Sequence, residues 1–178
     1  LVADLLTLSH LDEDGPGDEV GATCDFAAVV REAVRDLGPF AEKRRLQLAA
    51  HTSEAQVLVA ADREAIRQVA GNLIDNAIKY TPEGGSVTVS VSTVGDTVQL
   101  DVVDTGIGLG PEDQERVFER FYRVDRARSR ELGGTGLGLS IVKNTVRRFG
   151  GEVGVRSALG SGSTFWVKLP RGGPAIHT

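Results

Sequence analysis

Two neighbouring segments that alternate apolar and polar residues constrain the fold most strongly. Ser86–Thr93 has the sequence S-V-T-V-S-V-S-T, Thr97–Val103 has T-V-Q-L-D-V-V, and Gly95-Asp96 lies between them. Such alternation is typical of a β-strand with one buried face, and a glycine-containing pair between two strands is typical of a tight hairpin turn. The sequence therefore predicts an antiparallel hairpin whose valine and leucine side chains face another layer of structure.

Helical periodicity elsewhere supplies that second layer. The predicted helices run from Phe26 to Arg44, from an N-cap at Asp62 to Tyr80, from Pro111 to Phe118 and from Gly138 to Phe149. Further strands are predicted at Leu46–His51, Gln56–Ala60, Glu152–Ser157 and Ser163–Leu169, and the polar turn T-S-E-A joins the first two. Because hairpins are mixed with helices, we expect an α+β fold with a mostly antiparallel sheet and helices on one face.

Composition limits the classes of partner. The 178 residues include 25 Asp or Glu and 20 Lys or Arg, which gives a net charge of −5. This balance argues against a general nucleic-acid or membrane-surface binder. A single cysteine, Cys24, cannot form an internal disulfide. No run approaches the roughly 18 apolar residues of a membrane span.

The chain has a simple predicted organisation. It contains no methionine, which predicts that it is a fragment of a longer protein. Leucines at helical spacing predict the end of a helix over residues 1–14, followed by a linker over residues 15–22. We expect one globular domain over residues 23–170 and a disordered tail over residues 171–178.

The predicted helix that ends at Tyr80 carries two stripes. The apolar stripe is expected to face the sheet and consists of Ile66, Val69, Ala70, Leu73 and Ala77. Asn72, Asn76 and Lys79 form a polar stripe beside it. A solvated helix face would have this pattern too, but asparagine is a poor residue for a helix interior. An amide oxygen suits Mg²⁺ and a lysine suits phosphate, so the stripe is a candidate site.

Two glycine-rich segments follow. D-T-G-I-G-L begins at Asp104, directly after a predicted strand. A carboxylate there would accept a hydrogen bond from an exocyclic amine, and Gly106 and Gly108 would let the backbone approach a flat ring. By itself, however, this segment is equally a glycine-rich turn. The second segment, L-G-G-T-G-L-G-L-S, leads into the helix at Gly138, where backbone N–H groups can bind an anion. It lacks the G-K-[ST] ending of a Walker A loop.

A locally basic stretch lies between these two segments. Phe118 and Phe121 are predicted to anchor one end of a mobile lid from Tyr122 to Gly134 that closes over phosphates. Its arginines are Arg123, Arg126, Arg128 and Arg130. The alternative interpretation is an ordinary solvated loop.

The order and spacing of four motifs are more specific than any one of them. N-L-x-x-N-A-x-K-Y-T, D-x-G-x-G, F-x-x-F-Y-R and G-T-G-L-G-L closely resemble the N, G1, F and G2 boxes of bacterial sensor histidine kinases. The resemblance covers residues 23–170. It implies a two-layer α/β sandwich of the Bergerat type, shared with type II topoisomerases, heat-shock 90 chaperones and mismatch-repair ATPases. It also implies ATP and Mg²⁺, and transfer of the γ-phosphoryl group to a histidine in a two-component system.

The resemblance implies roles for individual residues. Asn76 would ligate Mg²⁺, and Asn72, Lys79 and Arg123 would be the catalytic residues near the phosphates. Asp104 would accept from the adenine amino group, with support from Thr164 through a water molecule. The full predicted ATP-binding set is Asn72, Asn76, Lys79, Tyr80, Asp104, Gly106, Ile107, Gly108, Arg123, Gly134, Thr135, Gly136, Leu137, Gly138, Leu139 and Thr164.

The first residues resemble the end of the dimerisation and phosphotransfer domain that precedes this unit in the family. His10 is not expected to be the acceptor, because the H-box pattern around an acceptor histidine is absent. The implied partners are that domain and a response regulator, and no nucleic acid. The resemblance further implies a cytoplasmic domain, monomeric as a fragment, from a homodimeric parent in the bacterial inner membrane.

One position separates the possible reactions. In ATPase relatives a glutamate one turn before the magnesium asparagine acts as general base, and here that position is Asn72. An amide cannot take a proton, whereas a neutral imidazole is already a nucleophile. This favours phosphoryl transfer to histidine over hydrolysis. A nucleotide-binding module that docks a partner without catalysis remains the alternative.

Overall fold

The computed structural model describes residues 22–52, 55–124 and 135–172. The helices are α2 (Phe26–Lys43), α3 (Arg63–Tyr80), α4 (Pro111–Arg116) and α6 (Gly138–Arg148). The strands are β1 (Cys24–Asp25), β2 (Gln47–His51), β3 (Leu58–Val59), β4 (Ser86–Val94), β5 (Thr97–Asp104), β6 (Glu152–Ala158) and β7 (Gly162–Pro170). Every helix predicted after residue 22 is present, and α2, α4 and α6 each end one or two residues earlier than expected.

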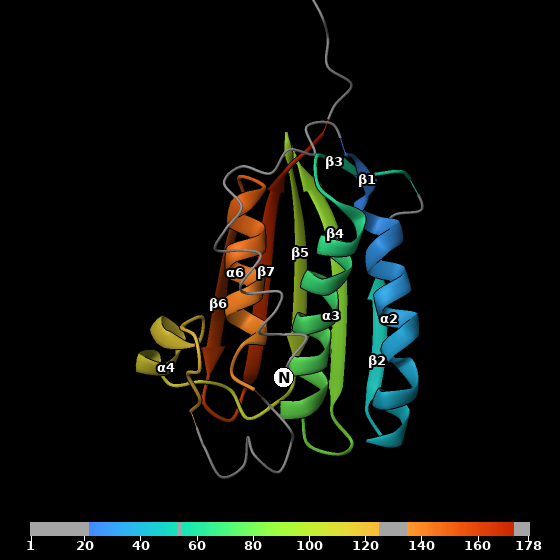
Figure 1. Cartoon of the computed structure of the whole chain (residues 1–178). Coiled ribbons are helices and arrows are strands. Elements are labelled where there is room, and N and C mark those ends of the chain that lie inside the picture. Colours follow the sequence, from blue (N-terminus) through green and yellow to red (C-terminus); the bar gives the residue numbers. More distant parts are fainter. Residues whose placement is uncertain (1–21, 53–54, 125–134, 173–178) are drawn as a thin grey trace, which may run out of the picture.

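The elements form two layers. A five-stranded sheet has the order β2-β4-β5-β7-β6, in which only the β2–β4 pair is parallel. Helices α2, α3 and α6 lie side by side over one face of this sheet (Figure 1). The predicted α+β, two-layer sandwich with a mostly antiparallel sheet is therefore confirmed. The predicted hairpin forms its centre, where β4 and β5 pair and Gly95 adopts a φ of 58° in the turn.

The core lies between the two layers. All five residues of the predicted apolar stripe on α3 are buried. They pack in one cluster with alternate side chains of the sheet, namely Val87, Val89, Val98, Leu100 and Val102. Full burial of a side chain of this size contributes about 1.5–3 kcal/mol. This packing fixes one side of α3 against the sheet and thereby determines which side carries the polar stripe.

Local signals set the ends of α3. The Asp62 side chain accepts a hydrogen bond from Ala65 N at 2.8 Å, as expected for an N-cap. At the other end Thr81 is extended (ψ 125°), which suits a residue before proline. The Thr81 hydroxyl donates to the carbonyl of Ala77 at 2.7 Å. The predicted start at Asp62 and end at Tyr80 are confirmed.

The two short strands before α3 belong to different sheets. The prediction joined Leu46–His51 and Gln56–Ala60 by a turn, but β2 pairs with β4, whereas β3 pairs with β1. The Asp25 carboxylate holds this second pair, because it caps α2 and also accepts from Val57 N at 3.3 Å. A contact over this sequence distance has no signature in a local turn pattern.

The folded unit extends slightly beyond the predicted boundary at residue 170. Arg171 N donates to Asp96 O at 2.8 Å, and Gly172 N donates to Leu58 O at 2.9 Å. These two residues were predicted as tail, but their backbone groups find partners in the sheets. The predicted upstream helix with His10, the linker up to residue 21, lid residues 125–134 and tail residues 173–178 lie outside the described residues. Among the described helices, none is both long and apolar enough to cross a membrane.

Candidate functional site

A cavity of about 380 Å³ lies at the end of the sheet where α3 and β5 end and α6 begins. Twelve of the predicted site residues line it: Asn72, Asn76, Lys79, Tyr80, Asp104, Ile107, Gly108, Arg123, Thr135, Gly136, Gly138 and Leu139. Residues from all four motifs therefore meet in one place. The volume is within the range of ordinary small-molecule sites.

Asp104 is the buried carboxylate of this cavity. It is only 6% exposed, and its Oδ1 accepts from Gly106 N at 2.8 Å and from Ser163 N at 3.2 Å. Neither of these bonds uses Oδ2, so this oxygen is the one that a donor on a ligand would meet. Burial raises the pKa of the Asp104 carboxyl, and the hydrogen bonds from Gly106 and Ser163 only partly oppose this.

The raised pKa of Asp104 predicts a pH-dependent free energy of unfolding. The folded protein keeps this proton to a higher pH than the unfolded chain, where an Asp has a pKa of about 3.9. The carboxyl therefore stabilises the fold most when protonated, and this contribution decreases as pH rises from about 3.9 through the raised folded-state pKa. Asp104→Asn cannot ionise and should lack this part of the pH dependence. Urea denaturation of both proteins between about pH 3.5 and pH 7 measures it. A wild-type-minus-variant difference that stays constant over this range would contradict the prediction.

The polar stripe of α3 faces the cavity. Asn72 Nδ2 donates to the carbonyl of Gly138 at 3.3 Å and so ties α3 to the start of α6. Lys79 Nζ lies 2.5 Å from Oδ2 of Asp75, one helical turn away. Asp75 also lines the cavity, and the sequence analysis did not select it.

The start of α6 is arranged to receive an anion. The N-cap residue of helix α6 is Leu137, whose apolar side chain cannot accept a hydrogen bond from the first N–H groups of the helix. Thr135, Gly136 and Gly138 line the cavity beside this helix end. Gly136 has a φ of +75°, and its carbonyl accepts from Phe121 N at 2.9 Å. This backbone bond joins the glycine-rich segment to the segment that carries Arg123.

Arg123 presents an unsatisfied donor at the same cavity. Its Nε is buried and has no hydrogen-bond partner in the described part of the chain. A buried guanidinium donor without a partner is costly unless a ligand satisfies it. Together with Lys79 and the start of α6, it makes this side of the cavity suitable for an anionic group.

Comparison with known proteins identifies this arrangement. Residues 61–173 match the family described as histidine kinase-, DNA gyrase B- and HSP90-like ATPases. The chain belongs to this ATPase family. The sensor histidine kinase RppB of Synechocystis is 37% identical over 170 residues, which cover 96% of this chain and 37% of RppB. The resemblance to sensor histidine kinases is therefore confirmed.

Solved structures agree with this assignment of the ATPase domain. Full-length ShkA, in complex with AMPPNP, superimposes with a TM-score of 0.84 and 31% identity, over 98% of this chain and 36% of ShkA. The catalytic domain of the histidine kinase ThkA superimposes with a TM-score of 0.74 and 26% identity, over 84% of this chain and 95% of that domain. The chain thus spans little more than a third of RppB and of ShkA.

One predicted residue of the ATPase domain lies on the wrong face of the sheet. Ser163 and Phe165 line the cavity, and successive strand residues point to opposite faces, so Thr164 points away. The prediction that Thr164 supports Asp104 is therefore wrong. Ser163 takes that place, because it pairs with Asp104 across the strands and its N–H donates to the carboxylate. The alternation of buried residues in β7 was a signal that could have identified it.

Two predictions in the glycine-rich motifs also need correction. Leu137 is completely buried and is absent from the cavity lining, because its side chain packs with Ile141 in a small apolar cluster at the start of α6. Gly106 does not line the cavity: a Cβ there would lie 2.6 Å from Asp104 Oδ1 and 2.7 Å from the Tyr80 carbonyl. A Cβ on Gly108 would meet the Ala158 carbonyl, so close backbone packing requires glycine there too, although Gly108 also lines the cavity as predicted. Gly134 lies outside the described residues.

The segment after α4 is anchored differently from the prediction. Phe118 packs edge-on against Phe165, with ring centroids 6.1 Å apart, but Phe121 is 61% exposed and contributes its backbone instead. Tyr122 supplies a second anchor, because its hydroxyl donates to Asp113 Oδ1 at 2.7 Å. Cavity-lining residues that the sequence analysis missed are Asp75, Leu109, Val117, Tyr122, Val124, Ser163 and Phe165.

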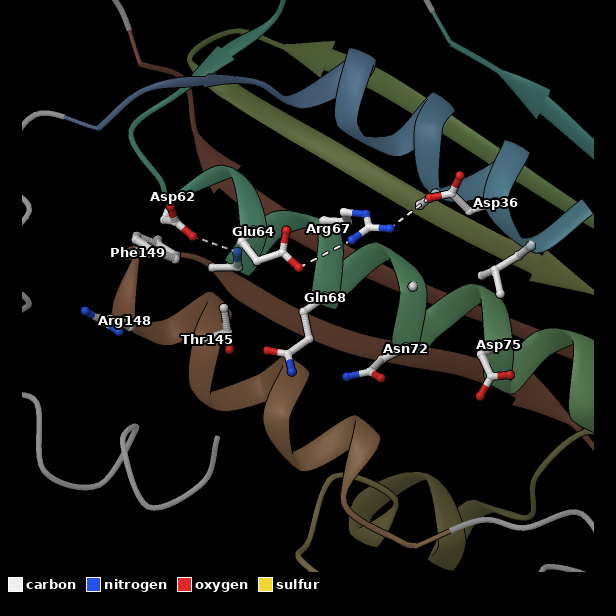
Figure 2. Close-up of a pocket in the computed structure, with 14 residues that line it drawn as sticks. Asp36, Asp62, Glu64, Arg67, Gln68, Asn72, Asp75, Thr145, Arg148 and Phe149 are labelled. Carbon is white, nitrogen blue, oxygen red and sulfur yellow. Dashed lines mark hydrogen bonds and ion pairs between the residues drawn. The ribbon is translucent and has the colours of Figure 1, made fainter. Parts of the chain in front are cut away.

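A larger groove of about 900 Å³ lies between α2, α3 and α6 on the outer side of the helical layer (Figure 2). Arg67 crosses this groove and pairs with Asp36 at 3.0 Å and with Glu64 at 3.5 Å. Asn72 and Asp75 line both the groove and the smaller cavity. These two residues therefore mark where the predicted site opens to the surface of the helices.

Proposed function

We propose that this domain binds ATP with Mg²⁺ and transfers the γ-phosphoryl group to a histidine side chain of the dimerisation and phosphotransfer domain of the same protein. The observation that carries the proposal is an amide at the position where a general base would be needed. Asp104 is buried instead, and its Oδ1 is bound by two backbone N–H groups. The position that would suit a general base is Asn72, which donates to Gly138. An acceptor that needs no deprotonation suits such a site.

The orientation of ATP follows from the two ends of the cavity. Oδ2 of Asp104 suits the amino group of adenine, and Tyr80 and Ile107 would flank the ring. The phosphates would lie toward Lys79, Arg123 and the first N–H groups of α6. The Nε of Arg123 is buried and has no hydrogen-bond partner among the residues that the structure describes. This supports the same direction, because a phosphate oxygen would satisfy it. The complex of the related ShkA with AMPPNP, an analogue of ATP, supports the choice of nucleotide.

The residues present fit a magnesium ion whose ligands would come mainly from the phosphates of ATP and from water. The described residues contain no cluster of three or more carboxylate, histidine or cysteine side chains that would hold a metal alone. The Asn76 amide lines the cavity and would supply one oxygen ligand. Mg²⁺ typically keeps several waters and takes its remaining ligands from phosphates. When bound, it would neutralise phosphate charge.

The chain's own residues would then position and stabilise the transfer. Asn72 would hold the start of α6 beside the phosphates, as its bond to Gly138 indicates. Lys79 and Arg123 would neutralise charge on the γ-phosphoryl group as it leaves. Catalysis would consist of in-line positioning and electrostatics, with little proton transfer by this domain.

The remaining partners follow from the family. We propose that the phosphorylated histidine passes its phosphoryl group to a response regulator, that the parent is a homodimer in the bacterial inner membrane and that this domain faces the cytoplasm. The relatives are sensor histidine kinases of which this chain covers only a part, which supports a longer parent.

Transfer between separate proteins tests this function. The 178-residue chain, mixed with the dimerisation and phosphotransfer domain of its parent and γ-labelled ATP, should label that domain on histidine. Labelling should be slow, because the tether that raises the local concentration is missing. The label should be acid-labile and base-stable, as a phosphoramidate is. The isolated chain should neither label itself nor hydrolyse ATP rapidly.

Each alternative predicts a different result in this experiment. An acid-stable label on serine would indicate a different kinase reaction. Rapid hydrolysis by the isolated chain would indicate an ATPase with a base that we have not identified. Tight ATP binding without any labelled histidine would indicate a nucleotide-dependent docking module.

A further inference from the structure

Asp75 occupies an unusual place for a carboxylate, because it lines a cavity whose other charged groups suit phosphates. It precedes Asn76 on α3 and lies at the junction of the cavity and the outer groove, where Figure 2 shows its side chain beyond Asn72 along the helix. Its Oδ2 is 2.5 Å from Nζ of Lys79. The side chains of Asp75 and Lys79 are 42% and 29% exposed, so water reaches both.

Lys79 has a single ammonium group, and two anions would compete for it. Ion pairs between partly exposed side chains one helical turn apart are weak, so a polyphosphate could displace the carboxylate. The displaced carboxylate would then remain near the phosphates as a like charge, which disfavours their binding. The competition for Lys79 and the repulsion from the displaced carboxylate both weaken nucleotide binding. Both also increase with the negative charge of the nucleotide.

We infer that Asp75 is a positioning residue that holds Lys79 in the absence of nucleotide and lowers the affinity of the site for phosphorylated nucleotides. This inference rests on the proposed nucleotide binding and extends it to one residue of this chain. The consequence is weaker retention of both ATP and its product ADP. Asp75 is not required to touch the nucleotide, because it acts by holding the Lys79 ammonium group that would otherwise bind a phosphate.

The affinities of Asp75→Asn for ATP, ADP, AMP and adenosine test this inference by isothermal titration calorimetry. We expect tighter binding of ATP and ADP by about three- to tenfold, a smaller gain for AMP and no change for adenosine. In a Lys79→Gln background, Asp75→Asn should improve ATP binding by a smaller factor than in the wild type, because only the repulsion between the carboxylate and the phosphates is then relieved. A general change in the fold would alter all four affinities alike and would not depend on Lys79.

Asp36→Asn is the matched control. It makes the same change of charge, and Asp36 also lines the groove and pairs with an arginine, but it is absent from the cavity lining. It should leave all four affinities unchanged. Equal gains in ATP affinity in both variants would show that net charge causes the effect and would overturn the inference. Unchanged or weaker ATP binding by Asp75→Asn would overturn it too. Failure of the wild-type protein to bind ATP would instead overturn the proposed function.

Discussion

Asn76→Ala is expected to abolish phosphoryl transfer to histidine. Asn76 lines the cavity from α3 and is the amide that we propose as the magnesium ligand. Changes in groups that merely support a metal ligand typically cost 10- to 100-fold, so loss of the ligand itself should cost about a hundredfold or more. Transfer rates measured with γ-labelled ATP, together with ATP affinity at increasing Mg²⁺ concentrations, provide the test.

The matched control for this variant is Asn144→Ala. Asn144 lies in α6 and is partly buried like Asn76, but it does not line the cavity. It should retain wild-type transfer and the wild-type dependence on Mg²⁺. Transfer by Asn76→Ala at a rate within a few-fold of wild type would show that Asn76 does not hold the metal.

Asp104→Asn should weaken the binding of adenine nucleotides by about 1–3 kcal/mol, or roughly five- to 150-fold. The carboxylate Oδ1 accepts from the N–H groups of Gly106 and Ser163, so an amide must place its oxygen there. Its NH₂ group then takes the place of Oδ2 and presents a donor to the amino group of adenine, which is also a donor. The geometry therefore leaves the variant no orientation that satisfies all three donors.

The same argument predicts an altered base preference. An NH₂ group in the position of Oδ2 suits a carbonyl, so the ratio of GTP to ATP affinity should rise in Asp104→Asn. Asp101→Asn is the control, because Asp101 lies on the same strand but bonds to Gln99 and pairs with Arg156, away from the cavity. Unchanged ATP affinity in Asp104→Asn, measured by isothermal titration, would show that adenine does not meet this carboxylate.

The sequence alone was sufficient for the features that repeat along the chain. The alternation in residues 86–103 predicted the β4–β5 hairpin, and the leucine, valine and alanine spacing on α3 predicted which of its faces is buried. The cap at Asp62 and the proline after Thr81 predicted both ends of that helix. These signals are local, since they depend on the backbone period and on side chains within one helical turn. The order and spacing of the four motifs predicted the family, and the match to the family of histidine kinase-like ATPases confirmed it.

Only the tertiary structure determined contacts between elements that are distant in sequence. The pairing of β5 with β7 places Ser163, and not Thr164, beside Asp104, and the burial of Leu137 against Ile141 keeps Leu137 out of the cavity lining. The position of Asp75 where the cavity meets the outer groove appears in no motif. A motif specifies which residue types follow one another, but strand register and helix packing decide which side chains meet, because these depend on how the whole core fills its volume.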